Sequence, residues 1–99
     1  GCKSKEEGIK SFNEGITLLK QKDYDRALEL FENSCENDIP EGCYNTAWIL
    51  EYKKSSFLTR WWYGNSIYTS YLRACNLGYT QACNKAKEYE EYKDGNGVI

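Results

Sequence analysis

Apolar side chains recur at steps of three and four residues along most of the chain, which is the period of an amphipathic α-helix. One apolar stripe covers residues 4–22 and a second covers residues 24–35. Pro40 then interrupts the pattern, because a proline inside a helix loses a hydrogen bond and clashes with the preceding turn. The stripes predict two helices joined as a hairpin. The first stripe consists of Ile9, Phe12, Ile16 and Leu19.

The same period predicts three further helices. One starts at about Glu41, a second covers about residues 65–76, and a third covers about residues 80–93. Gly78 lies between the last two and is typical of a left-handed helix stop. No segment indicates a strand. The helices therefore alternate as A-B-A-B-A, with short links between them.

Cysteine spacing reveals an internal repeat. Cys35 and Cys43 are eight positions apart, as are Cys75 and Cys83, and the two pairs are offset by 40 residues. A period of this length is typical of helical solenoids, in which each hairpin buries its apolar stripe against its neighbours. The sequence predicts an all-α fold of antiparallel helical hairpins stacked as a short right-handed solenoid. It forms one domain with a tether (1–4), two repeats (5–41 and 42–81) and a capping helix or partial third repeat (82–99).

These residues resemble a known family. Small and aromatic residues of the first hairpin stand in tetratricopeptide register, namely Gly15, Tyr24, Ala27, Phe31 and Ser34. The segments 42–47 and 71–83 resemble Sel-like repeats of the tetratricopeptide superfamily, in their cysteine-paired bacterial form. Residues 92–98 are similar to the glycine-rich turn that follows helix A in that family. Lys87, where helix A usually has a small residue, indicates that the last helix is an exposed cap or that the chain was cut within a repeat.

The four paired cysteines allow three interpretations from the residues alone. They are disulfides, buried free thiols or a metal site, although the spacing is too wide for typical zinc ligands and the chain has no His. The resemblance implies disulfides Cys35–Cys43 and Cys75–Cys83, counted as intra-repeat bonds, each tying the end of helix B to the start of the next helix A. Two structural disulfides would indicate an oxidising compartment. No metal and no cofactor is expected.

Cys2 is the odd cysteine. Residues 1–4 resemble the end of a bacterial lipoprotein signal, in which a small residue precedes a cysteine that becomes acylated. This hypothesis makes Cys2 a lipidation site that anchors the protein to a membrane. The alternative is that Cys2 is an incidental thiol. Together with the disulfides, the lipidation hypothesis predicts a bacterial protein that is periplasmic, envelope-anchored or secreted.

Charge and motifs limit the functional classes. The net charge is -2, with 13 basic residues spread among 15 acidic ones, so the basic footprint of a nucleic-acid-binding protein is missing. No nucleophile motif, phosphate loop or His is present. We therefore expect no catalysis. The alternative is a β-lactam- or cell-wall-peptide-binding or hydrolysing enzyme, as is known for some relatives of the resembled family.

The segment 57–63 is the strongest sign of binding. It places three large aromatic residues beside an arginine in a predicted loop, and these residue types are enriched at interface hot spots. Trp48, on a helix A, is expected to be mostly buried, whereas at least one of Trp61 and Trp62 is expected to be exposed. The sequence thus predicts a scaffold that binds a protein or peptide through its helix A faces and this aromatic insertion, which would also support self-association. The predicted contact residues are Asn45, Trp48, Arg60, Trp61, Trp62 and Tyr63.

Overall fold

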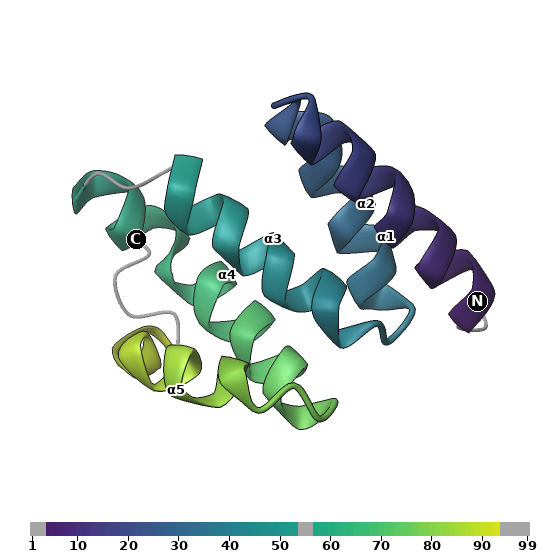
Figure 1. Cartoon of the computed structure of the whole chain (residues 1–99). Helices are drawn as coiled ribbons and strands as arrows, with labels where there is room; N and C mark the ends of the chain where they lie inside the picture. The colour runs from purple at the N-terminus through teal and green to yellow at the C-terminus, as the bar shows by residue number, and fades with distance from the viewer. Residues whose placement is uncertain (1–3, 54–56, 94–99) are drawn as a thin grey trace.

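The described part of the chain folds into five α-helices that pack one after another (Figure 1). This computed structural model describes residues 4–53 and 57–93, with only the backbone for residues 53 and 57–61. No strand occurs within those ranges, so the predicted all-α class is confirmed. The elements are α1 (Lys5–Lys20), α2 (Tyr24–Glu36), α3 (Pro40–Lys53), α4 (Phe57–Asn76), α5 (Gln81–Glu88) and a short 3-10 helix, η1 (Glu90–Tyr92).

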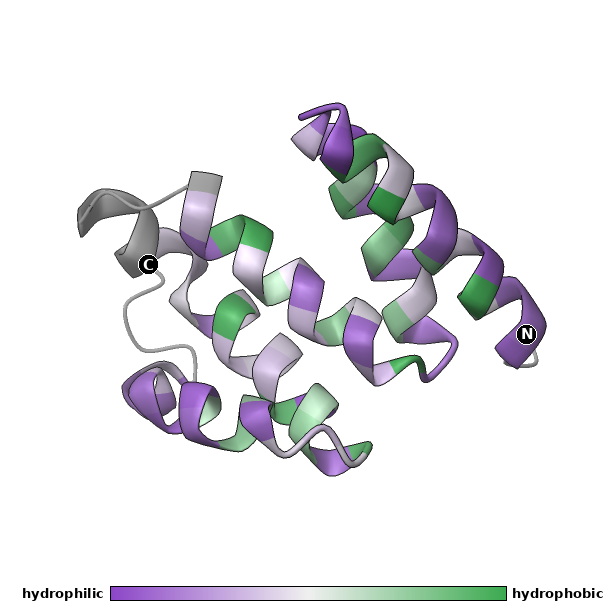
Figure 2. Cartoon of the chain, viewed as in Figure 1, coloured by the Kyte–Doolittle hydropathy of each residue, from purple (hydrophilic) through white to green (hydrophobic). Residues whose placement is uncertain are grey.

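The helices form stacked hairpins. Helices α1 and α2 make the first hairpin, α3 and α4 make the second, and α5 packs against α4 (Figure 1). Helix α3 also contacts α2, so each helix rests on the one before it. The predicted A-B-A-B-A order is confirmed. Apolar and polar positions are interspersed along each helix, as expected when only one face is buried (Figure 2).

Two disulfides join successive helices. Cys35–Cys43 links the last turn of α2 to the first turn of α3, and Cys75–Cys83 links α4 to α5. The predicted pairing is confirmed, and with repeats bounded at residues 41 and 81 each bond connects one repeat to the next. Closing such a short loop stabilises a fold by about 2–3 kcal/mol in the chain-entropy model. Disulfides of this kind indicate an oxidising, extracellular-type environment.

The 40-residue repeat is visible in the backbone at the ends of α2 and α4. The amide of Ile39 donates a hydrogen bond to the Ser34 carbonyl at 3.0 Å, and the amide of Tyr79 donates to the Ala74 carbonyl at 2.9 Å. In both turns the residue before the donating amide has a positive φ, 64° in the first and 104° at Gly78 in the second. Both helices therefore end in the same left-handed motif, which confirms Gly78 as the predicted stop.

Lys22 occupies the same left-handed position after α1, with a φ of 64°. A side chain there strains the backbone, whereas glycine adopts this conformation freely. We expect Lys22→Gly to raise the free energy of unfolding by about 0.5–1 kcal/mol in urea denaturation. Lys20→Gly, inside the last helical turn, should lower it by about the same amount. Changes of the same sign in both variants would contradict this account.

Small residues allow the helices to approach closely. A Cβ atom built on Gly15 would lie 2.8 Å from the Phe31 ring, which is closer than real Cβ contacts. Ala27 and Ala47 have no solvent exposure. All three small residues are therefore buried between packed helices, with Gly15 directly against the Phe31 ring.

The core has two parts. A smaller cluster around Phe31, with Ala27 and Ile49, holds the first hairpin on α3. A larger cluster unites the facing sides of α2, α3, α4 and α5. Its buried members are Cys35, Cys43, Ala47, Leu50, Ile67, Tyr71, Ala74, Ala82, Ala86 and Tyr89.

The prediction of a loop over residues 57–63 is wrong. Helix α4 begins at Phe57 and runs through the aromatic segment. That segment contains no proline, so nothing in it forbids a helix. Gly64 then provides a packing site inside the helix, because a Cβ atom there would lie 2.6 Å from the Tyr92 ring.

The last helix is shorter than the predicted range 80–93. Helix α5 ends at Glu88 and η1 follows it. Tyr89 turns its side chain into the core, where it is 3% exposed. The Asn65 side-chain amide donates to the Tyr92 carbonyl at 2.7 Å, so a residue of α4 supplies a hydrogen bond to the carbonyl at the end of η1.

Candidate functional site

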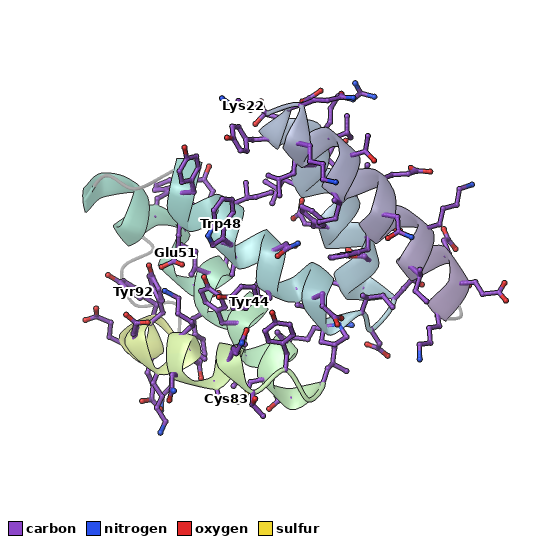
Figure 3. All side chains as sticks on the ribbon, viewed as in Figure 1. Lys22, Tyr44, Trp48, Glu51, Cys83 and Tyr92 are labelled. Atoms are coloured by element: carbon purple, nitrogen blue, oxygen red, sulfur yellow. A yellow bond between two sulfur atoms is a disulfide. The ribbon has the colours of Figure 1, made fainter. Side chains whose placement is uncertain are left out.

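Helix α3 carries a row of aromatic rings along one face. Tyr44, Trp48 and Tyr52 follow one another at four-residue intervals, which puts them on the same side of a helix. The rings of Trp48 and Tyr52 stack with centroids 5.1 Å apart and planes 4° from parallel. Trp48 is 39% exposed and Tyr52 is 57% exposed, so this stacked pair presents ring surface to solvent. Figure 3 shows Tyr44 and Trp48 on the same side of α3.

Two further tyrosines extend this row at its ends. The Tyr24 ring, at the start of α2, lies 5.6 Å from the Tyr52 ring. Tyr79, in the turn between α4 and α5, stacks on Tyr44 at 4.9 Å. The pKa of Tyr24 is raised, first because neighbouring groups exclude water from it and second because the Tyr52 phenol lies close. The aromatic strip, as we call this set, consists of Tyr24, Tyr44, Trp48, Tyr52 and Tyr79.

A polar cluster centred on Glu51 lies beside the strip. The Tyr71 hydroxyl of α4 donates to Oε1 of Glu51, and the Tyr89 hydroxyl donates to Oε2 at 2.5 Å. Nζ of Lys85 on α5 lies 3.5 Å from Oε1 and 5.6 Å from the centre of the Tyr71 ring. This Glu51 cluster, made of Glu51, Tyr71, Lys85 and Tyr89, connects α3 and α4 to α5 and the residue that follows it.

Burial determines the ionisation of Tyr71. Its side chain has no solvent exposure, and this desolvation is the main reason why the pKa of Tyr71 lies far above its ordinary value. The hydrogen bond to Glu51 and the negative charge of that carboxylate raise the pKa further. Tyr71 is therefore a neutral hydrogen-bond donor throughout the physiological range.

The Glu51 cluster acts as a brace between helices. Both carboxylate oxygens accept hydrogen bonds from buried phenols, and the Lys85 ammonium offsets the charge. Such a satisfied network favours one arrangement of the helices it joins. Among the described residues, no group of three or more His, Cys, Asp or Glu side chains is placed to hold a metal ion.

The prediction that Trp48 is mostly buried is wrong. The positions of α3 that face its neighbours are held by Thr46, Ala47, Ile49 and Leu50, which are 0–7% exposed. Trp48 lies on the remaining face and packs against Tyr52 instead. Its indole contributes to the surface of the scaffold more than to its core.

The structure separates the predicted contact residues onto two helices. Asn45 is half-buried and shares α3 with Trp48. Trp62 and Tyr63 lie on α4, where Trp62 is 56% exposed, as predicted for at least one tryptophan of the segment, and Tyr63 packs against the larger core cluster. The side chains of Arg60 and Trp61 lie outside the described residues.

Residues 1–3 also lie outside the description, so the lipidation of Cys2 stays a prediction. Within the described ranges, no helix has the length and apolar character required to cross a bilayer.

Several site residues were not predicted from the sequence. Tyr24 was noted only for its place in the tetratricopeptide register, and Tyr52 and Tyr79 belong to no motif. Only the four-residue interval from Trp48 to Tyr52 indicated a shared face. A signal for Glu51 did exist. Tyr71 stands 40 residues after Phe31, so the repeat adds a hydroxyl at a buried position that requires an acceptor.

Comparison of the chain with known proteins gives no match to any family model, and no curated protein or solved structure is significantly similar.

Proposed function

We propose that this chain is a non-enzymatic, exported scaffold that binds a protein or peptide through the aromatic strip. The observation that carries the proposal is the exposure of the stacked Trp48–Tyr52 pair. Leaving a large ring in water forgoes about 1.5–3 kcal/mol of burial, which is a substantial part of the stability of a small domain. A partner that covers the pair would recover that free energy.

The strip favours a partner segment with large apolar or aromatic side chains. Rings of this type bury a large area, and their polar atoms remain available for hydrogen bonds at the rim of an interface. Trp48 and Tyr52 already hold each other in place, so their ordering adds little entropic cost to binding. Asn45, one turn before Trp48 on α3, would add a polar contact.

The proposed family and location rest on separate observations. Membership of the cysteine-paired Sel-like repeats is supported by the 40-residue repeat, which the helix ends of α2 and α4 share in detail. Export to a bacterial periplasm or envelope is supported by the two disulfides. Acylation of Cys2 would then hold the scaffold at a membrane.

Peptides selected from a random display library on the immobilised chain test the proposed surface. We expect Trp48→Ser with Tyr52→Ser to weaken peptide binding at least about tenfold, because hot-spot aromatics commonly contribute more than 1.4 kcal/mol. Titration calorimetry measures the dissociation constants. Circular dichroism should show unchanged helicity, because both rings are exposed.

Trp62→Ser provides the control, since it removes an exposed indole from α4, where Trp62 is 56% exposed against 39% for Trp48. It should leave binding within about twofold if the strip is the contact surface, because side chains outside the hot spot are nearly neutral. If only the Trp62 variant lost binding, the aromatic segment 57–63 would be the contact surface instead of the strip. A library that yields no binder for the folded chain would count against a peptide-binding role.

A further inference from the structure

The two disulfides differ in their accessibility, although both span eight residues and join the same kinds of helix end. Cys35 is 8% exposed and Cys43 is fully buried. Cys75 and Cys83 are each partly exposed. The molecule therefore contains an internal control, because one disulfide is shielded and the other is accessible at an equivalent pair of helix ends.

The shielding has a structural cause in the stacking of the repeats. The first bond lies inside the larger core cluster, to which Ile67 and Tyr71 of α4 also belong. Within residues 4–53 and 57–93, no α-helix follows α5 to cover the second bond in the same way.

The uncovered position is a hollow of about 200 Å³ between α4 and α5. Both sulfur-bearing residues, Cys75 and Cys83, line it, so a small molecule in the hollow would contact the disulfide. The rest of the lining is mostly apolar, with one positive and one negative residue. These residues are Tyr68, Leu72, Ala86, Lys87 and Glu90.

We propose that Cys75–Cys83 is a thiol–disulfide exchange site that reacts with dithiol reductants while the Cys35–Cys43 disulfide stays intact. A thiolate of the dithiol attacks one sulfur of the pair. The Cys75–Cys83 bond breaks, a mixed disulfide forms, and the other cysteine leaves as a thiolate that takes up a proton. The second thiol of the reductant, once deprotonated, then attacks the mixed disulfide. The dithiol is oxidised to a disulfide, and two electrons reduce the protein bond to two thiols.

Access decides which bond reacts. Exchange requires approach of the attacking thiolate to a sulfur atom. At Cys75–Cys83 the hollow allows this approach in the folded state. Lys87 and Glu90 carry opposite charges at its lining, so neither attraction nor repulsion of a thiolate dominates there. At Cys35–Cys43 the approach requires the larger core cluster around the bond to open, which is a sub-global opening of the fold.

Opening the second bond would release α5. This helix has eight residues, too few to be stable alone, and the disulfide lies in its first turn. Its other attachments include the packing of Ala82 and Ala86, the ion pair of Lys85 with Glu51 and the hydrogen bond of Tyr89 to Glu51. Reduction would thus loosen α5 and leave α1 to α4 packed, with α2 and α3 still joined by Cys35–Cys43.

Graded reduction of the folded full-length chain tests this proposal. Any free thiol is first blocked with N-ethylmaleimide. Dithiothreitol is then added without denaturant, new thiols are trapped with iodoacetamide over time, and peptides are analysed by mass spectrometry. We expect Cys75 and Cys83 to be trapped at least about tenfold faster than Cys35 and Cys43. Hydrogen exchange of the partly reduced chain should be faster in α5 and unchanged in α1.

Matched variants identify the reactive bond independently. A chain with Cys35→Ala and Cys43→Ala should keep the fast reaction, and a chain with Cys75→Ala and Cys83→Ala should keep only the slow one. A thioredoxin-type protein in place of dithiothreitol shows whether protein dithiols also reach the bond; reaction with either reductant supports the proposal. Equal rates for both bonds in the native chain, or reduction of Cys75–Cys83 only at the rate of global unfolding, would overturn it, even if the variants fail to fold.

Discussion

Replacing Glu51 by Leu should lower the free energy of unfolding by about 3 kcal/mol, because two buried phenols would lose their acceptor. Tyr71 and Tyr89 are 0% and 3% exposed, so water does not readily replace the carboxylate. The variant also removes the counter-charge of Lys85, which lies 3.5 Å from Oε1. Urea denaturation of both chains measures the loss, and hydrogen exchange should show that α5 opens more readily.

A second replacement separates the hydrogen bond from the shape of the side chain. Tyr71→Phe in the Glu51→Leu background removes the stranded hydroxyl, so part of the lost stability should return. Glu51→Gln keeps an acceptor for one phenol and should have an intermediate effect. If Glu51→Leu left the free energy of unfolding unchanged, the Glu51 cluster would not brace the helices. If the double variant were no more stable than Glu51→Leu, the stranded Tyr71 hydroxyl would not be the source of the loss.

The fold could be predicted from the sequence because its determinants are local and repeated. Cysteine pairs eight residues apart, at an offset of 40, revealed the repeat, and the resemblance to the cysteine-paired family implied its disulfides. Gly78 indicated a helix end through its own backbone freedom. Such signals depend on neighbours in the sequence, so they can be read before the helices are placed in space.

The course of α4 could not be read in this way. The aromatic residues of the segment 57–63 were interpreted as a binding loop. What favours helix there includes packing from the far end of the chain, where the Tyr92 ring covers Gly64. A contact between residues so distant in sequence leaves no periodic trace.

The same limit applies to the aromatic strip and to Trp48. Burial of a ring depends on how two hairpins meet, and small residues such as Ala47 took the positions at that contact. The indole was thereby left on the open face of α3. Its stacking partner Tyr52 lies one turn away, but its contact with Tyr24 of α2 depends on the crossing of helices.

Alkaline titration should reveal Tyr71 as a phenol that ionises only when the protein unfolds. Its pKa in the folded chain lies well above the ordinary value of about 10, mainly through desolvation and then through Glu51. In the unfolded chain the same phenol loses its proton near pH 10. Above that pH the unfolded state therefore binds fewer protons than the folded state, and the stability falls as the pH rises.

The expected slope from this one group is up to about 1.4 kcal/mol per pH unit above pH 10. Tyr71→Phe should reduce the slope by that amount, because the unfolded chain then has one fewer phenol to ionise. Trp62→Ser removes no titratable group, so its slope should equal that of the unaltered chain. Urea denaturation between pH 9 and 11 gives the slopes, and absorbance at 295 nm counts the ionised phenols. A slope that Tyr71→Phe leaves unchanged would mean that the Tyr71 hydroxyl reaches water in the folded protein, and the brace between α3 and α4 would then be absent.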